Sequence, residues 1–344
     1  MTKGTSTRRK NRLPGSLYGN FDPGNNDKLM ITYRREPSHD YTMEGTCGVL
    51  FEGEMHFFGG AFNISGVDHQ HQHFVIETQR SEQLVKMTKK EDLEIGLYRP
   101  ECSTFEMTGE HFPWLKINVV ILCFDINYIM PCFSFDGQLN YICDSNYEHI
   151  GGGLTKYKEN LLTVSGYWTN QKTEILRMTE TKNFSWSVVE PYFKFAPGDY
   201  ICHHSLVTVE SSDINEEYVL LIGGTYRDDD DDSRTMNNIF KFNGTWFPFG
   251  QLKKPRYDHN SIYWNGAVYV IGGIYDPDNL DWYDYLEESS FSYFLDEKYK
   301  NTKMEIWNIK DSPDQFRAKE NWPELFHWEY PHLFIVPDSF FPDH

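Results

Sequence analysis

An apolar run that ends in two adjacent glycines occurs more than once in this chain of 344 residues. It is written YVLLIGG over 218–224 and YVIGG over 269–273, and HFFGG over 56–60 repeats the ending. Short runs rich in Val, Ile and aromatic residues, bounded by turn residues, are typical of β-strands. The recurrence therefore predicts a chain built from similar β-units.

Six segments share this pattern of a turn followed by a short apolar β-run, at a mean spacing of about 55 residues, close to the length of a four-stranded repeat. They are GEMHFFGG (53–60), KINVVILCF (116–124), ENLLTVSG (159–166), EYVLLIGG (217–224), GAVYVIGG (266–273) and PHLFIVPD (331–338). Helical periodicity is weak, whereas alternation of β-branched and aromatic residues with polar ones is common. Glu52-Gly53 and Asn265-Gly266 suit tight hairpins. The sequence therefore predicts an all-β fold.

The clearest unit has four predicted strands. The first three cover 258–264, 267–273 and 303–309, and the fourth lies near QFRAKENW and ends at about Trp322. The preceding unit repeats this order as ICHHSLVTV, YVLLIGG, NNIFKFN and TWFPFG. Four-stranded antiparallel units repeated radially form a β-propeller, which leaves no long sheet edge exposed.

The stretch TWFPFGQLKKPRYDHNSIYWNGAVYVIGG resembles a kelch repeat across the junction of two units. The signature residues are Trp246, Arg256, His259 and three glycine pairs, Gly59-Gly60, Gly223-Gly224 and Gly272-Gly273. The resemblance implies that Arg256 and His259 bridge neighbouring strands through hydrogen bonds. The glycines would permit close approach of another backbone and unusual dihedral angles. The third segment keeps one glycine, and the second and sixth keep none.

The two ends of the chain supply half a unit each. The sixth unit stops at His344 without room for its third and fourth strands, while unassigned β-runs cover 16–22 and 28–36. We expect these N-terminal runs to complete the last unit. The predicted fold is a six-bladed kelch-type β-propeller, a single domain over 16–344 after a disordered basic tail over 1–15. The predicted blades cover about 41–90, 99–146, 148–191, 199–250, 256–322, and 324–344 with 16–36.

The formal charge of −19, from 51 acidic and 32 basic residues, disfavours nucleic acid and an anionic membrane as partners, because both would repel the chain. A basic protein or peptide remains possible, as does an acidic surface that only maintains solubility. The N-terminus lacks the apolar stretch of a secretory signal, and the longest apolar run is too short to span a bilayer. We therefore expect a cytoplasmic monomer.

Cysteines and sequons carry little information in the sequence. The six cysteines show neither zinc-site spacing nor disulfide-rich density, and most lie in apolar runs, where free thiols behave as small buried hydrophobes. The sequons at Asn63, Asn183 and Asn243 are about as many as chance supplies, so they do not place the chain outside the cell. No cofactor or metal is expected.

Three connections between second and third predicted strands are the candidate functional segments, and blade geometry would open all three on one face. The candidate partner-binding residues are Asp229, Asp230 and Asp231 in the fourth unit, and Trp282, Tyr283, Tyr285, Phe291 and Tyr293 in the long acidic insertion of the fifth. Aromatic residues among acidic ones are typical of interface anchors, although these could instead cap the propeller's own face. The alternating His69, His71 and His73 of the first unit could bind a metal, but solvent-facing alternation is the preferred interpretation. Likewise, the aspartate run lacks the glycine turn and distal Glu of a calcium loop.

Two classes of function fit a propeller. The first is a non-catalytic protein–protein interaction module that presents the acidic, aromatic-rich loop face to a partner. The second is a propeller enzyme of the galactose-oxidase or sialidase kind, which no local motif supports, since FNGTWF has only the end of a sialidase box. No catalytic residue is assigned, and fold alone does not decide between the two.

Overall fold

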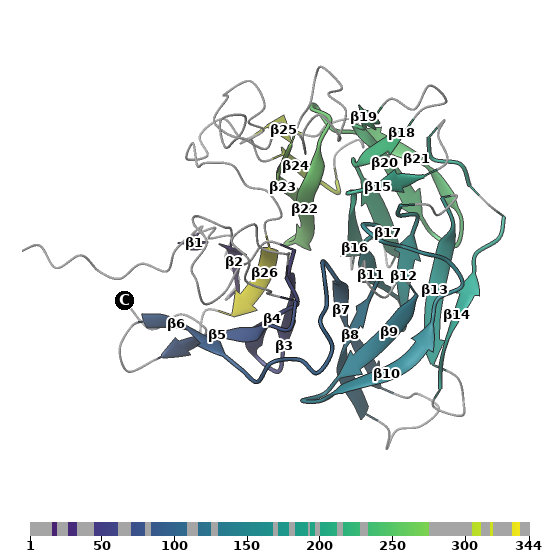
Figure 1. Cartoon of the computed structure of the whole chain (residues 1–344). Helices are drawn as coiled ribbons and strands as arrows, with labels where there is room; N and C mark the ends of the chain where they lie inside the picture. Colours follow the sequence, from purple (N-terminus) through teal and green to yellow (C-terminus); the bar gives the residue numbers. More distant parts are fainter. Residues whose placement is uncertain are drawn as a thin grey trace, which may run out of the picture.

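The computed structural model describes residues 16–18, 27–32, 45–60, 70–79, 84–108, 116–124, 130–167, 171–178, 183–191, 193–196, 200–211, 216–227, 233–274, 305–310, 317–318 and 332–337. These ranges form 26 β-strands and contain no helix, so the all-β class is confirmed. In particular, no helix able to cross a membrane occurs within them. The strands form antiparallel sheets that stand side by side (Figure 1).

The first three sheets are four-stranded antiparallel meanders, in which each strand pairs with the next one along the chain. The first contains β3 (Cys47–Phe51), β4 (Glu54–Phe58), β5 (His73–Gln79) and β6 (Leu84–Lys89). The second contains β7 (Glu101–Thr108), β8 (Lys116–Cys123), β9 (Pro131–Phe135) and β10 (Leu139–Asp144). The third contains β11 (Leu154–Tyr157), β12 (Asn160–Val164), β13 (Thr173–Met178) and β14 (Phe184–Val188).

The fourth sheet carries a small additional sheet between its second and third strands. Its main strands are β16 (Ser205–Ser211), β17 (Glu216–Ile222), β20 (Asn238–Phe242) and β21 (Trp246–Gln251). The addition consists of a hairpin, β18 (Thr225–Arg227) and β19 (Ser233–Thr235), with β15 (Ile201–Cys202) paired to β18. The fifth sheet contains β22 (Tyr257–Trp264), β23 (Ala267–Ile274), β24 (Glu305–Asn308) and β25 (Arg317–Ala318), as the sequence pattern predicts.

The sixth sheet joins the two ends of the chain. Its strands are β1 (Ser16–Tyr18), β2 (Asp27–Thr32) and β26 (His332–Pro337), and β2 lies between the other two. Antiparallel pairing runs from Asp27 opposite Pro337 to Thr32 opposite His332. The predicted pairing of the N-terminal run with the C-terminal one is therefore confirmed.

First strands form the contacts between consecutive sheets. The strand β7 contacts both β3 and β11, β16 contacts both β11 and β22, and β26 contacts both β22 and β3. The strand β26 thus has the contacts of a first strand. The residues predicted to precede it as a first strand, 325–330, lie outside the described residues, so the place of β26 as a second strand stays a prediction. The sixth sheet also has three described strands instead of the predicted four, and the closed six-bladed ring stays a prediction.

The core lies between sheets, and second strands are covered on both faces. Along β17, Val219 and Leu221 pack with residues of the third sheet, while Leu220 and Ile222 pack with residues of the fifth. All four side chains are fully buried. A strand buried on both faces needs a continuous apolar run rather than alternation, which explains why the repeated segment reads YVLLI.

The paired glycines end second strands where another backbone comes close. A Cβ on Gly223 would lie 2.6 Å from the carbonyl oxygen of Arg256, and a Cβ on Gly273 would lie 2.6 Å from that of Tyr257. Both glycines also have positive φ, 59° and 88°. The structural explanation of these glycines is confirmed.

The cysteines differ from expectation. A disulfide joins Cys47 of β3 to Cys102 of β7, and a second joins Cys123 of β8 to Cys132 of β9. The interpretation of the apolar-run cysteines as free thiols is therefore wrong for Cys47 and Cys123, because the fold brings together residues whose spacing gives no signal. Only Cys143 and Cys202 are free. The expected cytoplasmic location stays a prediction.

Candidate functional site

The ends of three second strands, β4, β12 and β17, meet the start of the next sheet. We call this end of the sheets the rim, and the candidate site lies on it. The amide N–H of Gly60 donates to the carbonyl oxygen of Leu97 at 3.0 Å, and that of Gly166 donates to Ile201 at 2.8 Å. A similar bond joins Gly224 to Arg256 at 2.8 Å. The connections from second to third strands begin at this rim, and most of their residues lie outside the described ones.

A cluster of three polar residues, Tyr167, His203 and Asp258, lies at this rim and spans three consecutive sheets. Tyr167 follows β12, His203 lies between β15 and β16, and Asp258 is the second residue of β22. Nδ1 of His203 lies 2.7 Å from Oδ1 of Asp258, and Nε2 of His203 is hydrogen-bonded to the hydroxyl of Tyr167. We call these three residues the His203 cluster.

The backbone presents the cluster in an unusual conformation. His203 and Asp258 have φ of 54° and 53°, in the left-handed region that side-chain-bearing residues rarely adopt. Backbone bonds hold both residues in place, since His203 N donates to Gly151 O at 2.8 Å and Asp258 N donates to His203 O at 3.0 Å. Such conformations concentrate at functional sites and persist where the surrounding structure enforces them.

The charges of the cluster favour a protonated imidazole. Burial of the His203 ring opposes its protonation, but Asp258, Tyr167 and Cys202, together with the hydrogen bond to Asp258, raise the pKa of His203 well above its usual value. Nearby, burial raises the pKa of Glu101 to about 7, although the charge of His203 acts in the opposite direction. The surroundings of His203 therefore favour the protonated form of its imidazole, with Nδ1 directed at Asp258.

This geometry suits positioning better than proton transfer. Both ring nitrogens of His203 are engaged, one by the Asp258 carboxylate and the other by the Tyr167 hydroxyl. A general base must instead offer a nitrogen to a substrate proton. The sequence did not point to this cluster, because its members lie far apart in the chain and carry no shared motif.

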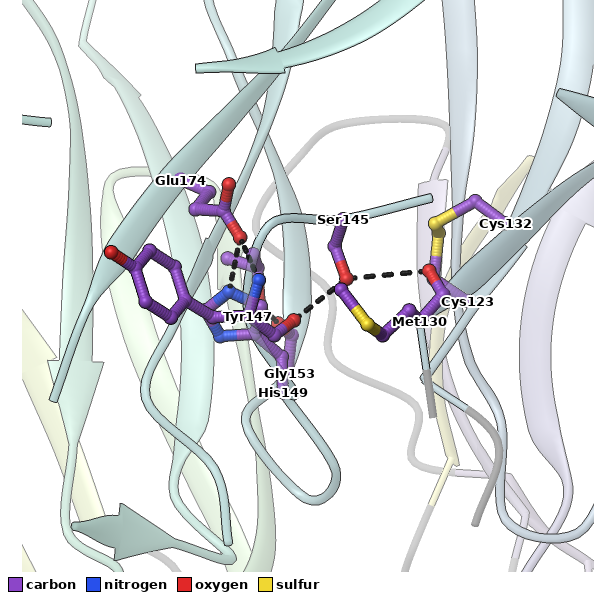
Figure 2. Close-up of a disulfide and its surroundings, with 9 residues drawn as sticks. Cys123, Met130, Cys132, Ser145, Tyr147, His149, Gly153 and Glu174 are labelled. Carbon is purple, nitrogen blue, oxygen red and sulfur yellow. Dashed lines mark hydrogen bonds and ion pairs between the residues drawn. A yellow bond between two sulfur atoms is a disulfide. The ribbon is translucent and has the colours of Figure 1, made fainter. Parts of the chain in front are cut away.

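A second histidine–carboxyl contact, between His149 and Glu174, is fully buried and ties the segment between the second and third sheets to β13 of the third (Figure 2). Nε2 of His149 lies 3.0 Å from Oε2 of Glu174, and Nδ1 lies 2.6 Å from the carbonyl oxygen of Ser165. The carboxylate of Glu174 also accepts from the backbone N–H groups of Asn146 and Tyr147. Every acceptor is thus used within the protein, so this pair is structural.

The histidines of the first unit do not form the predicted alternating strand. The strand β5 begins at His73, and His71 lies before it with Nδ1 2.8 Å from the carbonyl oxygen of Leu93. His73 is buried, with its ring stacked on Phe58 and Nε2 3.0 Å from Nδ1 of His56. Solvent-facing alternation is therefore wrong for His73, because its ring packs against Phe58 of β4 and Phe135 of the second sheet. His69 lies outside the described residues.

The kelch signature residues join neighbouring strands. Nη1 of the fully buried Arg256 donates to the carbonyl oxygen of Gly272 at 2.9 Å, and Nε2 of His259 lies 2.9 Å from Oγ of Ser205 in the preceding sheet. Nε1 of Trp246 donates to Oγ1 of Thr173, also in the preceding sheet, at 2.9 Å. These contacts agree with the bridging role that the resemblance implies.

The predicted partner-binding residues, Asp229, Asp230, Asp231, Trp282, Tyr283, Tyr285, Phe291 and Tyr293, lie outside the described residues. The structure does describe how the aspartate run is attached. The strands β18 and β19 pair up to Arg227 opposite Ser233, so residues 228–232 join the two strands of a hairpin. The sequence predicted a simple loop here and missed this hairpin, whose strands are only three residues each.

Metal-binding geometry is not found in the described ranges, where no three or more His, Cys, Asp or Glu side chains group around a common point. Comparison with protein-family models finds no match for this chain, and comparison with curated proteins finds none either. The fold therefore defines the class, an all-β protein of successive antiparallel sheets with a charged rim. The kelch resemblance stays a prediction.

Proposed function

We propose that this chain is a closed six-bladed kelch-like propeller that serves as a non-catalytic protein–protein interaction module. The binding surface is the rim with the second-to-third-strand connections, and the partner is a basic protein or peptide. The order of first-strand contacts supports closure, because β26 touches both β22 and β3.

The observation that carries the binding role is the hairpin of β18 and β19. It connects through five consecutive aspartates, 228–232, and leaves the fourth sheet at the same rim as the other connections. A concentrated negative charge on a chain of net charge −19 attracts basic partners and repels acidic ones, which raises association rates and selectivity.

The His203 cluster supports a binding role over a catalytic one. Its imidazole is held on both sides by Asp258 and Tyr167, so it fixes the relative position of three neighbouring sheets. A rigid rim keeps the connections in register, which lowers the ordering cost when a partner binds. The aromatic residues of 275–304 would add the apolar anchors that interfaces need.

The test compares two triple charge reversals in the full chain. The first is Asp229→Lys with Asp230→Lys and Asp231→Lys. The matched control is Asp136→Lys with Glu159→Lys and Glu210→Lys, three exposed acids at the opposite ends of their sheets. Binding of an arginine-rich peptide is measured by fluorescence anisotropy at low and high salt, with an acidic peptide of equal length as the negative probe.

We expect the first variant to lose at least about tenfold in affinity, and the control to lose much less. Wild-type binding should also weaken as salt rises. Equal losses in both variants would show that net charge, rather than the rim, attracts the peptide. A deletion of 276–300 that leaves affinity unchanged would exclude the aromatic insertion from the binding surface.

A further inference from the structure

Two of the three sequons lie at equivalent exposed places in adjacent sheets. Asn243, Gly244 and Thr245 form the turn between β20 and β21, and all three are exposed. Asn183 precedes β14 in the connection from β13, and Asn183 and Ser185 are both exposed. Each sequon therefore lies at the junction of the third and fourth strands, where an oligosaccharide would meet no buried surface.

The contacts of Asn243 are compatible with a glycan. Its Nδ2 donates to Oε1 of Glu216 at 2.6 Å on the exposed surface, and its backbone N–H donates to the carbonyl oxygen of Thr245 at 3.2 Å. A glycosylated amide keeps one N–H, so the bond to Glu216 can persist. Modification would therefore not require the turn to open.

Both sequons lie away from the rim of the His203 cluster. Glu216, the contact of Asn243, opens β17, whereas the glycines at the far end of β17 meet the start of the next sheet. A strand of this length spans about 20 Å. Glycans at these sites would leave the rim accessible.

The disulfides provide an independent indication of the compartment. Cys47–Cys102 joins the first and second sheets, and Cys123–Cys132 joins two strands of the second sheet. Disulfides form and persist in oxidising compartments, and N-glycosylation occurs in secreted proteins. Two separate features thus agree on the same environment, which the N-terminal sequence alone does not indicate.

We propose that Asn243 and Asn183 are N-glycosylation sites and that the chain matures in an oxidising compartment. In the reaction, the side-chain nitrogen bonds to the anomeric carbon of a lipid-linked oligosaccharide diphosphate, which is the donor. The amide loses one proton and the lipid diphosphate leaves, so no oxidant is needed. The inference goes beyond partner binding and does not depend on it.

The test uses the full chain purified from cells that express it naturally. Peptide N-glycosidase converts a glycosylated asparagine to aspartate, and mass spectrometry of peptides should find this conversion at positions 183 and 243. In cells that carry variants, Thr245→Ala and Ser185→Ala should abolish the modification at their own sites. Thr245→Ser and Ser185→Thr are the matched controls, because they preserve the sequons.

Thiol alkylation gives the second readout. The protein is unfolded in the presence of the alkylating reagent, without a reductant. Under these conditions only Cys143 and Cys202 should react. The proposal is overturned if both asparagines are unmodified in the native chain. Alkylation of Cys47, Cys102, Cys123 and Cys132 without reduction would overturn the assignment of the compartment.

Discussion

The hydroxyl oxygen of Thr46 lies 3.0 Å from Nε2 of His332, although 286 residues separate the two in sequence. Thr46 directly precedes β3, and His332 opens β26, so this buried contact fixes the C-terminal strand on the first sheet. Aromatic rings add to it, since Phe57 meets Phe334 edge to face with ring centroids 5.6 Å apart. Strand β26 is thus held by both polar and apolar contacts.

Phe57 should be a large contributor to this junction. It is fully buried, stacks on Phe74 with centroids 4.9 Å apart and contacts both His332 and Phe334. We expect Phe57→Ala to lower the free energy of unfolding by about 3–5 kcal/mol, because it leaves a cavity. Phe247→Ala, at a side chain 40% exposed, is the control and should cost about 0.5 kcal/mol or less. Denaturant unfolding measures both, and equal costs would contradict the role given to Phe57.

Substitutions at two glycines of one hairpin distinguish the stability cost of a strained backbone conformation from the cost of a close backbone contact. Gly273 and Gly266 both have positive φ, but a Cβ would lie 2.6 Å from the carbonyl oxygen of Tyr257 at Gly273 and meet nothing within 4 Å at Gly266. We expect Gly266→Ala to lower the free energy of unfolding by about 1–2 kcal/mol, because alanine is disfavoured at positive φ. Gly273→Ala should cost clearly more, because backbone must move. Thermal unfolding that ranks the two in the opposite order would contradict this explanation of the paired glycines.

The repeated strands could be predicted from the sequence because each unit must bury a continuous apolar run between two neighbours. The glycine pairs and Asn265-Gly266 then mark where strands end and turn. The pairing of β2 with β26 was also predictable, since both ends of the chain carry incomplete units. The contacts of β26 with the first strands β22 and β3 were not, because an isolated apolar run carries no information on which neighbour it contacts.

The two disulfides should differ in their effect on stability. Cys47–Cys102 closes a loop with a sequence separation of 55, and Cys123–Cys132 closes one with a separation of 9. In the chain-entropy account, closing the longer loop stabilises the folded state by about 4 kcal/mol, and closing the shorter loop stabilises it by about 2.6 kcal/mol. Replacing Cys47 and Cys102 together by Ala should therefore lower the denaturation midpoint more than replacing Cys123 and Cys132. The reverse order would show that local packing, rather than loop closure, dominates.

The stacked histidines of the first sheet should make the fold sensitive to acid. Burial, with smaller effects of charge, lowers the pKa of His73 to about 3 and that of His56 to about 4, against 6.5 for an exposed imidazole. As pH falls below 6.5, the unfolded chain binds protons that the folded chain excludes, so stability decreases until about pH 3, the folded-state pKa of His73. His73→Gln should reduce this slope, because it removes one of the two buried imidazoles. Parallel stability curves for wild type and His73→Gln would contradict the assignment.

The candidate site was less predictable than the fold. Acidic and aromatic connections are visible in the sequence, but the His203 cluster is assembled from three sheets, and no spacing rule links Tyr167, His203 and Asp258. The same holds for His56 beside His73 and for the disulfide partners. These contacts depend on how strands pair within a sheet, as for His56 with His73 and Cys123 with Cys132, or on how sheets pack against one another, as for the His203 cluster and Cys47 with Cys102. Single-strand patterns encode neither.

The central claim is that the first and last segments of the chain form one sheet. Hydrogen–deuterium exchange tests it in three proteins, the full chain, a chain lacking residues 1–15 and a chain lacking residues 1–36. The amides of β26 should exchange slowly in the first two, because β2 remains paired with β26 along its whole length. They should exchange rapidly in the third, which should also aggregate through its exposed strand edge. A monomeric protein lacking 1–36 with unchanged protection of 332–337 would contradict the account.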